Sequence, residues 1–457
     1  MVRVKNPPSA PLFVCAFVPG VRHSRAGRVS LTRLLVAVSL VCATLLTVAG
    51  ADARTDGGDV LWQDEFDAIE ISASDGRVAA VGTVPNPDGS LRSLVRVYDA
   101  DRGTLLWQDA VAAQSVVLAG NRAVVAGGGA VRGYDAKKGR LEWRDVAPFV
   151  VTQLYRDEDT TLATALTPDG TAIRVRVYDT KRGTVLVRDQ ILRDESFGPS
   201  VPAVSAFSGG RMFVASRTAV DDPTDDTGQL IFPCQVRAYS ITTGARLWTT
   251  TQPVLVPNTR DCGPRAITAD RKRVVLVGIG SFFNDFMAQG YDARTGAFRW
   301  QHLSLVGTGL IDAAVAVDVD GRLAFVGGWT RSTDPAAFSF DQDFVIHALN
   351  TSTGVLRWEA RSRAPGCPQP GVGRCQAHMR LVVVDSRTVY GAGFLGETGI
   401  SIPGTGFLQA YESQSGLLRW QDDDVDVQAL AATKGSVVIL TPGADSDEVM
   451  LRAYDGR

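Results

Sequence analysis

One phrase of eleven residues recurs seven times along the chain and constrains its fold more than any other feature. Each copy has an apolar stretch, a polar turn, a glycine and a second apolar stretch. All copies but one end in Trp, four residues after the glycine. The copies are VYDADRGTLLW (97–107), GYDAKKGRLEW (133–143), VYDTKRGTVLV (177–187), AYSITTGARLW (238–248), GYDARTGAFRW (290–300), ALNTSTGVLRW (348–358) and AYESQSGLLRW (410–420). Their spacing of 36 to 62 residues predicts a propeller or solenoid array of short strands.

Each part of the phrase has a physical role. Glycine permits a positive φ in a tight hairpin, and an Asp or Asn beside the turn can accept hydrogen bonds from nearby backbone amides. Trp puts a large apolar plate on the outer strand, where it can pack against the next unit. Of the eight tryptophans, seven stand at this position, including one outside the seven phrases: Trp62, Trp107, Trp143, Trp248, Trp300, Trp358 and Trp420.

The chain ends on LRAYDGR (451–457), which is the first half of a phrase. The missing half is GGDVLWQD (57–64), with Gly58 four residues before Trp62. We therefore expect the N-terminal strand to complete the C-terminal sheet and to close a ring that has no open edge. Seven complete phrases and one split phrase predict an all-β, eight-bladed propeller of four-stranded antiparallel blades over residues 57–457. Blade 6 illustrates the expected plan, with strands over 310–318, 322–329, 343–350 and 355–360.

The phrase at 348–358 resembles the repeat A-x-[DN]-x-x-T-G-x-x-x-W of the PQQ-like, or quinoprotein alcohol dehydrogenase-like, propellers. That superfamily includes the PQQ-dependent alcohol dehydrogenases and the BamB propellers of outer-membrane barrel assembly. The resemblance covers roughly residues 57 to 457 and implies the fold, whereas the Trp phrase joins blades and binds no cofactor. Val187 departs from the pattern by replacing Trp in the third copy, which weakens the docking expected there.

The N-terminal segment differs from the body. Residues 34–51 form an apolar run behind Arg28 and Arg33, and Ala51-Asp52-Ala53 offers a cleavage box. Residues 1–53 therefore read as a secretory leader, with an uncleaved membrane anchor as the alternative. The rest of the chain has 41 basic and 48 acidic residues, a formal charge of −7, which argues against a nucleic-acid partner. We expect an exported, periplasmic or extracellular protein without a membrane span in its body, present as a monomer.

The four cysteines of the body indicate disulfides in an exported chain. Cys234 ends the second-to-third loop of blade 4 and Cys262 lies in the connection out of that blade, whereas Cys367 and Cys375 lie in one connection, so we expect the pairs 234–262 and 367–375. Zinc is disfavoured because the cysteines lack CxxC spacing.

Long intervals between strands all fall at one end of the expected ring, in blades 4 to 7. They are 218–232, 249–263, 281–286, 330–342, 361–377 and 395–406, whereas the turns at the other end are short. Because loops held by a rigid scaffold often bind partners, we expect a binding face there. The alternative is loop growth without a function.

Aromatic residues gather in these intervals. Trp329 is the one tryptophan that belongs neither to the seven phrases nor to the split phrase, and it stands near Arg331. With Phe282, Phe283, Phe286 and Phe394 they can form a surface for an extended peptide or a planar ligand. The alternative is that these rings fill the space beneath the long loops.

Catalytic and metal patterns are weak. GxSxG, HExxH and Walker motifs are absent, and His302, His347 and His378 are scattered, with His347 expected to be structural. The acidic run at 220–226 lacks a Ca²⁺ ligand ladder and reads as a solvated loop. No Cys-Cys pair, such as quinoprotein dehydrogenases carry, is present. The sequence thus favours a non-catalytic scaffold that binds a protein or peptide at the cell envelope without PQQ or Ca²⁺; the alternative is a PQQ-dependent dehydrogenase.

Overall fold

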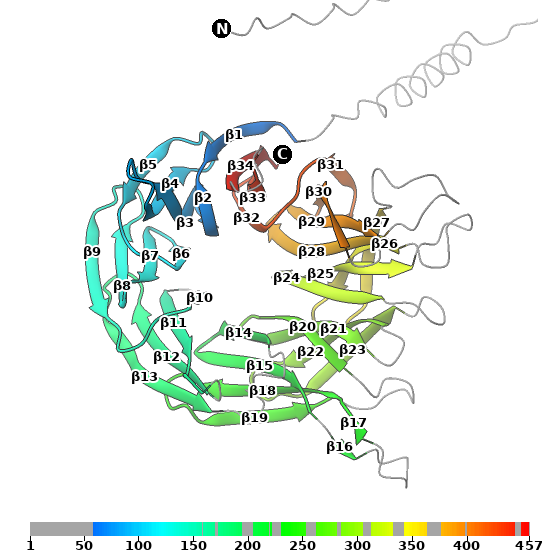
Figure 1. The fold of residues 1–457 in the computed structure, drawn as a ribbon. Coiled ribbons are helices and arrows are strands. Elements are labelled where there is room, and N and C mark those ends of the chain that lie inside the picture. Colours follow the sequence, from blue (N-terminus) through cyan, green and yellow to red (C-terminus); the bar gives the residue numbers. More distant parts are fainter. Residues whose placement is uncertain are drawn as a thin grey trace, which may run out of the picture. The chain divides into compact units, whose positions relative to one another are not determined.

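The computed structural model describes residues 58–456 except 158, 170–171, 194–203, 219, 222–229, 253–261, 281–284, 305–311, 332–341, 363–375, 398–399 and 444–448. The described residues form strands and turns, and they include no helix long and apolar enough to span a bilayer. Within this part of the chain, eight four-stranded antiparallel blades follow one another around a circle (Figure 1). The predicted all-β, eight-bladed propeller is confirmed. Residues 1–53, the expected leader, lie outside the described residues.

Blades 1 to 3 are simple four-stranded meanders. Blade 1 contains β2 (Asp67–Ser74), β3 (Arg77–Pro85), β4 (Leu91–Asp99) and β5 (Leu105–Asp109). Blade 2 contains β6 (Ser115–Ala119), β7 (Arg122–Gly127), β8 (Ala130–Asp135) and β9 (Leu141–Val146). Blade 3 contains β10 (Gln153–Asp157), β11 (Thr160–Leu166), β12 (Ala172–Asp179) and β13 (Val185–Arg193).

Blades 4 and 5 follow the same order. Blade 4 contains β14 (Val204–Ser208), β15 (Arg211–Arg217), β18 (Cys234–Ser240) and β19 (Arg246–Thr251). A two-stranded ribbon, β16 (Val220–Asp221) with β17 (Leu230–Ile231), stands between β15 and β18. Blade 5 contains β20 (Cys262–Ala269), β21 (Arg273–Gly280), β22 (Asp285–Asp292) and β23 (Phe298–Ser304).

Blades 6 and 7 have longer strands. Blade 6 contains β24 (Ala313–Asp320), β25 (Leu323–Arg331), β26 (Gln342–Asn350) and β27 (Leu356–Ser362). Blade 7 contains β28 (Gln376–Asp385), β29 (Thr388–Glu397), β30 (Ile400–Glu412) and β31 (Leu418–Asp422). A parallel bridge between Gln342 and Gln376 joins the two blades at the end where the long intervals lie.

Blade 8 closes the ring. It contains β32 (Ala429–Thr433), β33 (Ser436–Pro442), β34 (Val449–Asp455) and, from the other end of the chain, β1 (Val60–Glu65). Strand β1 runs antiparallel to β34, with Val60 opposite Tyr454 and Trp62 opposite Ala453. The predicted closure by the N-terminal strand is therefore confirmed, and it pairs strand edges that would otherwise invite aggregation.

The hydrophobic core lies between blades. In the described residues, the first strand of each blade contacts the first strand of the next, from β2 around to β32 and back to β2. Eight clusters of buried apolar side chains each join the facing sides of two neighbouring blades. Because each sheet covers its neighbours, the radial arrangement holds only while the junctions stay filled.

Candidate functional site

Tryptophans on the outer strands join the blades. In the described structure, six indole N–H groups each donate to a backbone carbonyl of the next blade, over 2.7 to 3.2 Å. The donor and acceptor pairs are Trp62 with Ala100, Trp107 with Ala136, Trp143 with Thr180, Trp248 with Ala293, Trp300 with Thr351 and Trp358 with Ser413. Each ring therefore packs against its neighbour and is also held in one orientation.

A polar contact accompanies the indole at four junctions. The second residue after the Trp is an aspartate, and it accepts a hydrogen bond from a tyrosine of the next blade over 2.5 to 2.9 Å. The indole stacks on the same tyrosine, with ring centroids 5.2 to 5.6 Å apart. Burial raises the pKa of these phenols, so they remain hydrogen-bond donors. The pairs are Asp64–Tyr98, Asp109–Tyr134, Asp145–Tyr178 and Asp422–Tyr454.

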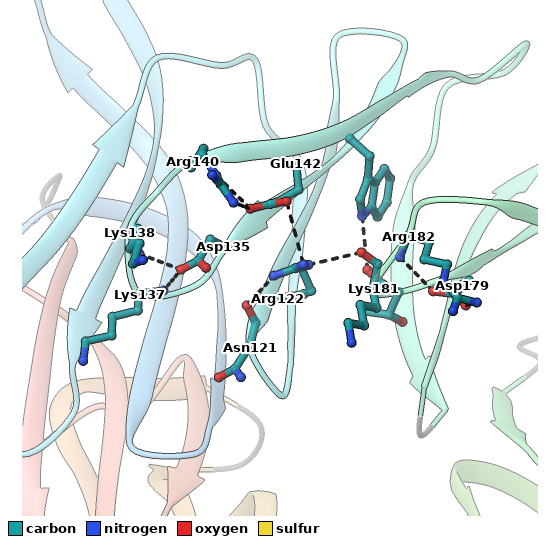
Figure 2. Close-up of polar contacts among 12 residues, drawn as sticks. Asn121, Arg122, Asp135, Lys137, Lys138, Arg140, Glu142, Asp179, Lys181 and Arg182 are labelled. Carbon is teal, nitrogen blue, oxygen red and sulfur yellow. Dashed lines mark hydrogen bonds and ion pairs between the residues drawn. The ribbon is translucent and has the colours of Figure 1, made fainter.

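The junction between blades 2 and 3 shows how the turns contribute (Figure 2). Arg122 of β7 donates to the Lys181 carbonyl in blade 3 and lies 3.9 Å from the Glu142 carboxylate of its own blade. Asp135 accepts a hydrogen bond from the Lys138 amide, as expected for an Asp beside the turn. Side-chain and backbone groups of both blades thus contact each other at the short-turn end of this junction.

The turn glycine makes room for the indole. Gly183 has a φ of +69°, in the left-handed region, and a Cβ there would lie 2.3 Å from the Trp143 ring. The glycine of the phrase therefore serves the hairpin and also the ring of the preceding blade.

The junction between blades 3 and 4 differs from its neighbours. Val187 pairs with Val177, which is the register position that Trp occupies in blades such as blade 1. The Gln190 side chain lies on the turn glycine of blade 4 instead, since a Cβ on Gly244 would meet its amide nitrogen at 2.0 Å. A small side chain and an amide thus stand where an indole is expected.

A cleft of about 360 Å³ opens at this junction. Its apolar lining consists of Leu162, Val177, Leu186 and Val187 of blade 3 and Ile241 of blade 4. Polar groups that also line it are Asp157, Asp159, Thr242 and Arg271. The lining turns connect first to second or third to fourth strands, so the cleft lies at the short-turn end of the ring. We did not predict this cleft; its one signal in the sequence is Val187 in place of Trp.

An arginine of the same blade binds aspartates on two outer strands. Arg176 is 5% exposed and binds the Asp189 carboxylate through two nitrogens, at 2.7 and 2.8 Å. It also donates to Asp145 of blade 2 at 2.5 Å. Asp189 has a φ of +50° and lies in a stretch where the pairing of β12 with β13 shifts register. The outer strand of blade 3 is therefore bulged just after Val187.

Two histidines meet between blades 5 and 6. His302 Nε2 lies 3.1 Å from His347 Nδ1, and His347 Nε2 lies 3.1 Å from a Glu359 carboxylate oxygen. Burial and the neighbouring His347 lower the pKa of His302 to about 4. His302 follows Trp300 by two residues, where four other blades carry the aspartate, and that spacing is the signal from which the pair could have been predicted.

The predicted aromatic surface is only partly described. Phe282 and Phe283 lie outside the described residues. Phe286 is 0% exposed and packs on His347, with ring centroids 4.6 Å apart, so it belongs to the core between blades 5 and 6.

The other three residues lie in neighbouring blades. Trp329 is half-buried in β25, opposite Phe344, and the Arg331 backbone pairs with Gln342 at the end of that strand. Phe394 of blade 7 is half-buried, and the guanidinium of Arg380 lies 4.1 Å from the centre of its ring. Trp329 stands on β25, which leads to the interval 332–341. The long interval predicted over 395–406 is wrong, because β29 and β30 extend into it, Phe394 pairs with Gly406, and only residues 398–399 separate the two strands.

Of the two predicted disulfides, one falls within the described residues. The predicted disulfide between Cys234 and Cys262 is present, with Cα atoms 5.1 Å apart, whereas Cys367 and Cys375 lie outside the described residues.

Across the described part of the chain, no group of three or more His, Cys, Asp or Glu side chains is arranged to hold a metal ion.

Eight four-stranded blades joined by outer-strand tryptophans define a closed β-propeller with tryptophan docking motifs. The family model described as outer membrane protein assembly factor BamB matches residues 47–196 and 284–457. Because these segments make up more than half of the sequence, the chain belongs to this family.

Solved structures with a related fold come from several organisms. Quinohemoprotein alcohol dehydrogenase ADHIIG from Pseudomonas putida HK5 is 11% identical, with a TM-score of 0.49 over 89% of this chain and 77% of that one. BamB from Moraxella catarrhalis is 12% identical, with a TM-score of 0.44 over 87% and 99%. Sqt1 from Saccharomyces cerevisiae is 12% identical, with a TM-score of 0.49 over 88% and 99%. Such values carry no function to this chain, and no curated protein sequence matches it.

Proposed function

We propose that this protein is an exported, non-catalytic scaffold that binds a protein or extended peptide at the cell envelope. Membership of the family of an outer membrane protein assembly factor supports a role in envelope assembly. The disulfide between Cys234 and Cys262 fits an oxidising compartment outside the cytoplasm. The predicted leader at residues 1–53 would deliver the chain there.

The observation that carries the proposal is the unequal length of connections at the two ends of the ring. In blades 6 and 7, two residues join the first strand to the second, as between Asp320 and Leu323. At the other end, the interval 332–341 separates β25 from β26, and 363–375 separates β27 from β28. Because segments held by a rigid scaffold often carry binding residues, we propose that the partner binds this face of blades 4 to 7.

Two aromatic side chains at the base of this face, those of Trp329 and Phe394, are suited to contact a partner. Trp329 and Phe394 offer aromatic surface, and Arg380 covers one side of the Phe394 ring. Arg331 stands two residues beyond Trp329 at the end of β25. Aromatic and Arg residues dominate binding energy at protein interfaces. Phe286 is left out because it is fully buried.

The experiment is capture of envelope proteins on the mature protein, followed by cross-linking to locate the contact. We expect a partner that binds the unaltered protein, cross-links to blades 4 to 7, and is lost from a Trp329→Ala, Phe394→Ala double variant. The matched control is Leu105→Ala, because Leu105 is 42% exposed on the outer strand of blade 1. Equal capture by both variants, or cross-links confined to blades 1 to 3, would contradict the proposed surface. Dye-linked alcohol oxidation after addition of PQQ and Ca²⁺ would contradict the non-catalytic role.

A further inference from the structure

The cleft between blades 3 and 4 lies where other junctions hold an indole. Val187 occupies the register position of the docking Trp, and its side chain lines the cleft. The neighbouring junctions on either side carry Trp143 and Trp248, each bonded to the following blade. At those junctions an indole ring of the chain fills the corresponding space, and between blades 3 and 4 that ring is missing.

The acceptor for that group is still in place. Ile241 donates its amide to the Gly210 carbonyl, as Ala136 does to Asn121 and Ala293 does to Lys272. Ile241 is therefore the backbone equivalent of the residues whose carbonyls accept indole N–H groups. Among the described residues, no hydrogen bond to the Ile241 carbonyl is formed, and Ile241 lines the cleft.

The walls suit a flat apolar ring. Leu162 and Ile241 are buried, and Leu186 is 54% exposed at the mouth. At about 360 Å³ the cleft falls within the range of small-ligand pockets, about 300–1,000 Å³. The apolar residues line part of the cleft, and Asp157, Asp159, Thr242 and Arg271 line the rest. An apolar wall beside the Ile241 carbonyl matches a ring that carries a single N–H donor.

We propose that this cleft binds an indole ring, whose N–H donates to the Ile241 carbonyl while its faces pack against Val187 and Leu186. The Gln190 amide covers Gly244, the surface that the docking indole covers elsewhere, and so borders the bound ring on its outer side. The ring comes from a free indole compound or from a tryptophan side chain of a peptide. This site does not rest on the partner surface proposed above, because it lies at the opposite end of the propeller.

Binding is measured by ligand-observed NMR on the mature protein, with three probes. They are N-acetyltryptophanamide, its 1-methyl derivative, and a short peptide with one central Trp. We expect saturable binding of N-acetyltryptophanamide or of the peptide, and at least several-fold weaker binding of the 1-methylated probe because it lacks the donor. Binding of the peptide alone identifies a peptide as the source, and binding of both identifies the ring by itself as sufficient.

The decisive variant is Val187→Trp, which supplies the missing ring from the chain. It is expected to abolish probe binding, whereas Leu105→Trp, which adds an exposed indole to blade 1, leaves binding unchanged. Leu186→Lys is a second test if Val187→Trp does not fold, because Leu186 is exposed and a charge at the mouth should weaken binding at least tenfold. The proposal is overturned if neither N-acetyltryptophanamide nor the peptide binds, if the folded variants bind as well as the unaltered protein, or if 1-methylation has no effect.

Discussion

Two buried indoles differ in one contact, and that difference predicts a measurable difference in stability. Trp300 is 5% exposed and donates to the Thr351 carbonyl at 2.9 Å. Trp420 is 4% exposed, but its Nε1 is buried without a hydrogen-bond partner in the described structure. At this closing junction the equivalent acceptor is Gly456, and its carbonyl accepts a hydrogen bond from Thr388.

Replacing each Trp by Phe keeps an aromatic ring and removes the N–H. Both variants lose similar apolar surface, because the two side chains are equally buried. Trp300→Phe also loses a net hydrogen bond and leaves a buried carbonyl unpaired, a cost of about 1–3 kcal/mol. Trp420→Phe removes an N–H that has no partner and does not incur this cost. We therefore expect Trp300→Phe to lower the free energy of unfolding by about 1–3 kcal/mol more than Trp420→Phe.

The assay is equilibrium unfolding in urea, followed by far-UV circular dichroism, with both variants measured beside the unaltered protein. The comparison uses the free energies extrapolated to water and requires that the dependence on denaturant stays the same. Equal losses for the two variants, or a larger loss for Trp420→Phe, would refute the assignment of the indole bond as a stabilising contact between blades.

Three further predictions concern other contacts. Replacing both Cys234 and Cys262 by Ser should lower the free energy of unfolding by about 2–4 kcal/mol, measured by urea unfolding; an unchanged value would show that the disulfide adds no stability. Because folding lowers the pKa of His302 from 6.5 to about 4, its contribution to the free energy of unfolding is complete above pH 6.5 and is lost as the pH drops toward 4. A urea midpoint measured across this range should fall less in His302→Gln, and an identical fall would exclude this histidine as the cause. Arg176→Met should cost about 1.5–3 kcal/mol in thermal or urea unfolding because it removes the hydrogen bonds of the guanidinium to Asp145 and Asp189. Arg176→Lys should not restore the loss, and full rescue by Lys would contradict the two-nitrogen geometry.

The repeat made the fold predictable because its information is local. Gly and Asp within one phrase specify a hairpin, and the Trp four residues later specifies an outer strand with an apolar face. For this reason the blade count, the pairing of β1 with β34 and the short turns could all be predicted. The bounds were less exact, since β24 begins at Ala313 and extends to Asp320, past the predicted end at 318.

The candidate sites were less predictable because they depend on residues far apart in the chain. Val187 was recognised as a departure that weakens docking, but the sequence did not indicate that Gln190 would move over the turn glycine and leave a cleft beside Ile241. His302 and His347 are 45 residues apart and meet only because neighbouring blades face each other. Phe286 looked available for binding and is buried by the same facing of blades.

The sequence by itself determined that this chain folds as a ring of eight like sheets, because seven sheets each come from one contiguous segment with its own turns. The eighth is recognised from the two halves of one phrase, at 57–64 and 451–457. Tertiary structure alone decided which junctions are filled and which remains open, and which polar groups meet between blades. The physical reason is that packing between sheets depends on the volumes and hydrogen bonds of side chains from two segments at once. The sequence of one segment does not specify which side chains the neighbouring segment places against it.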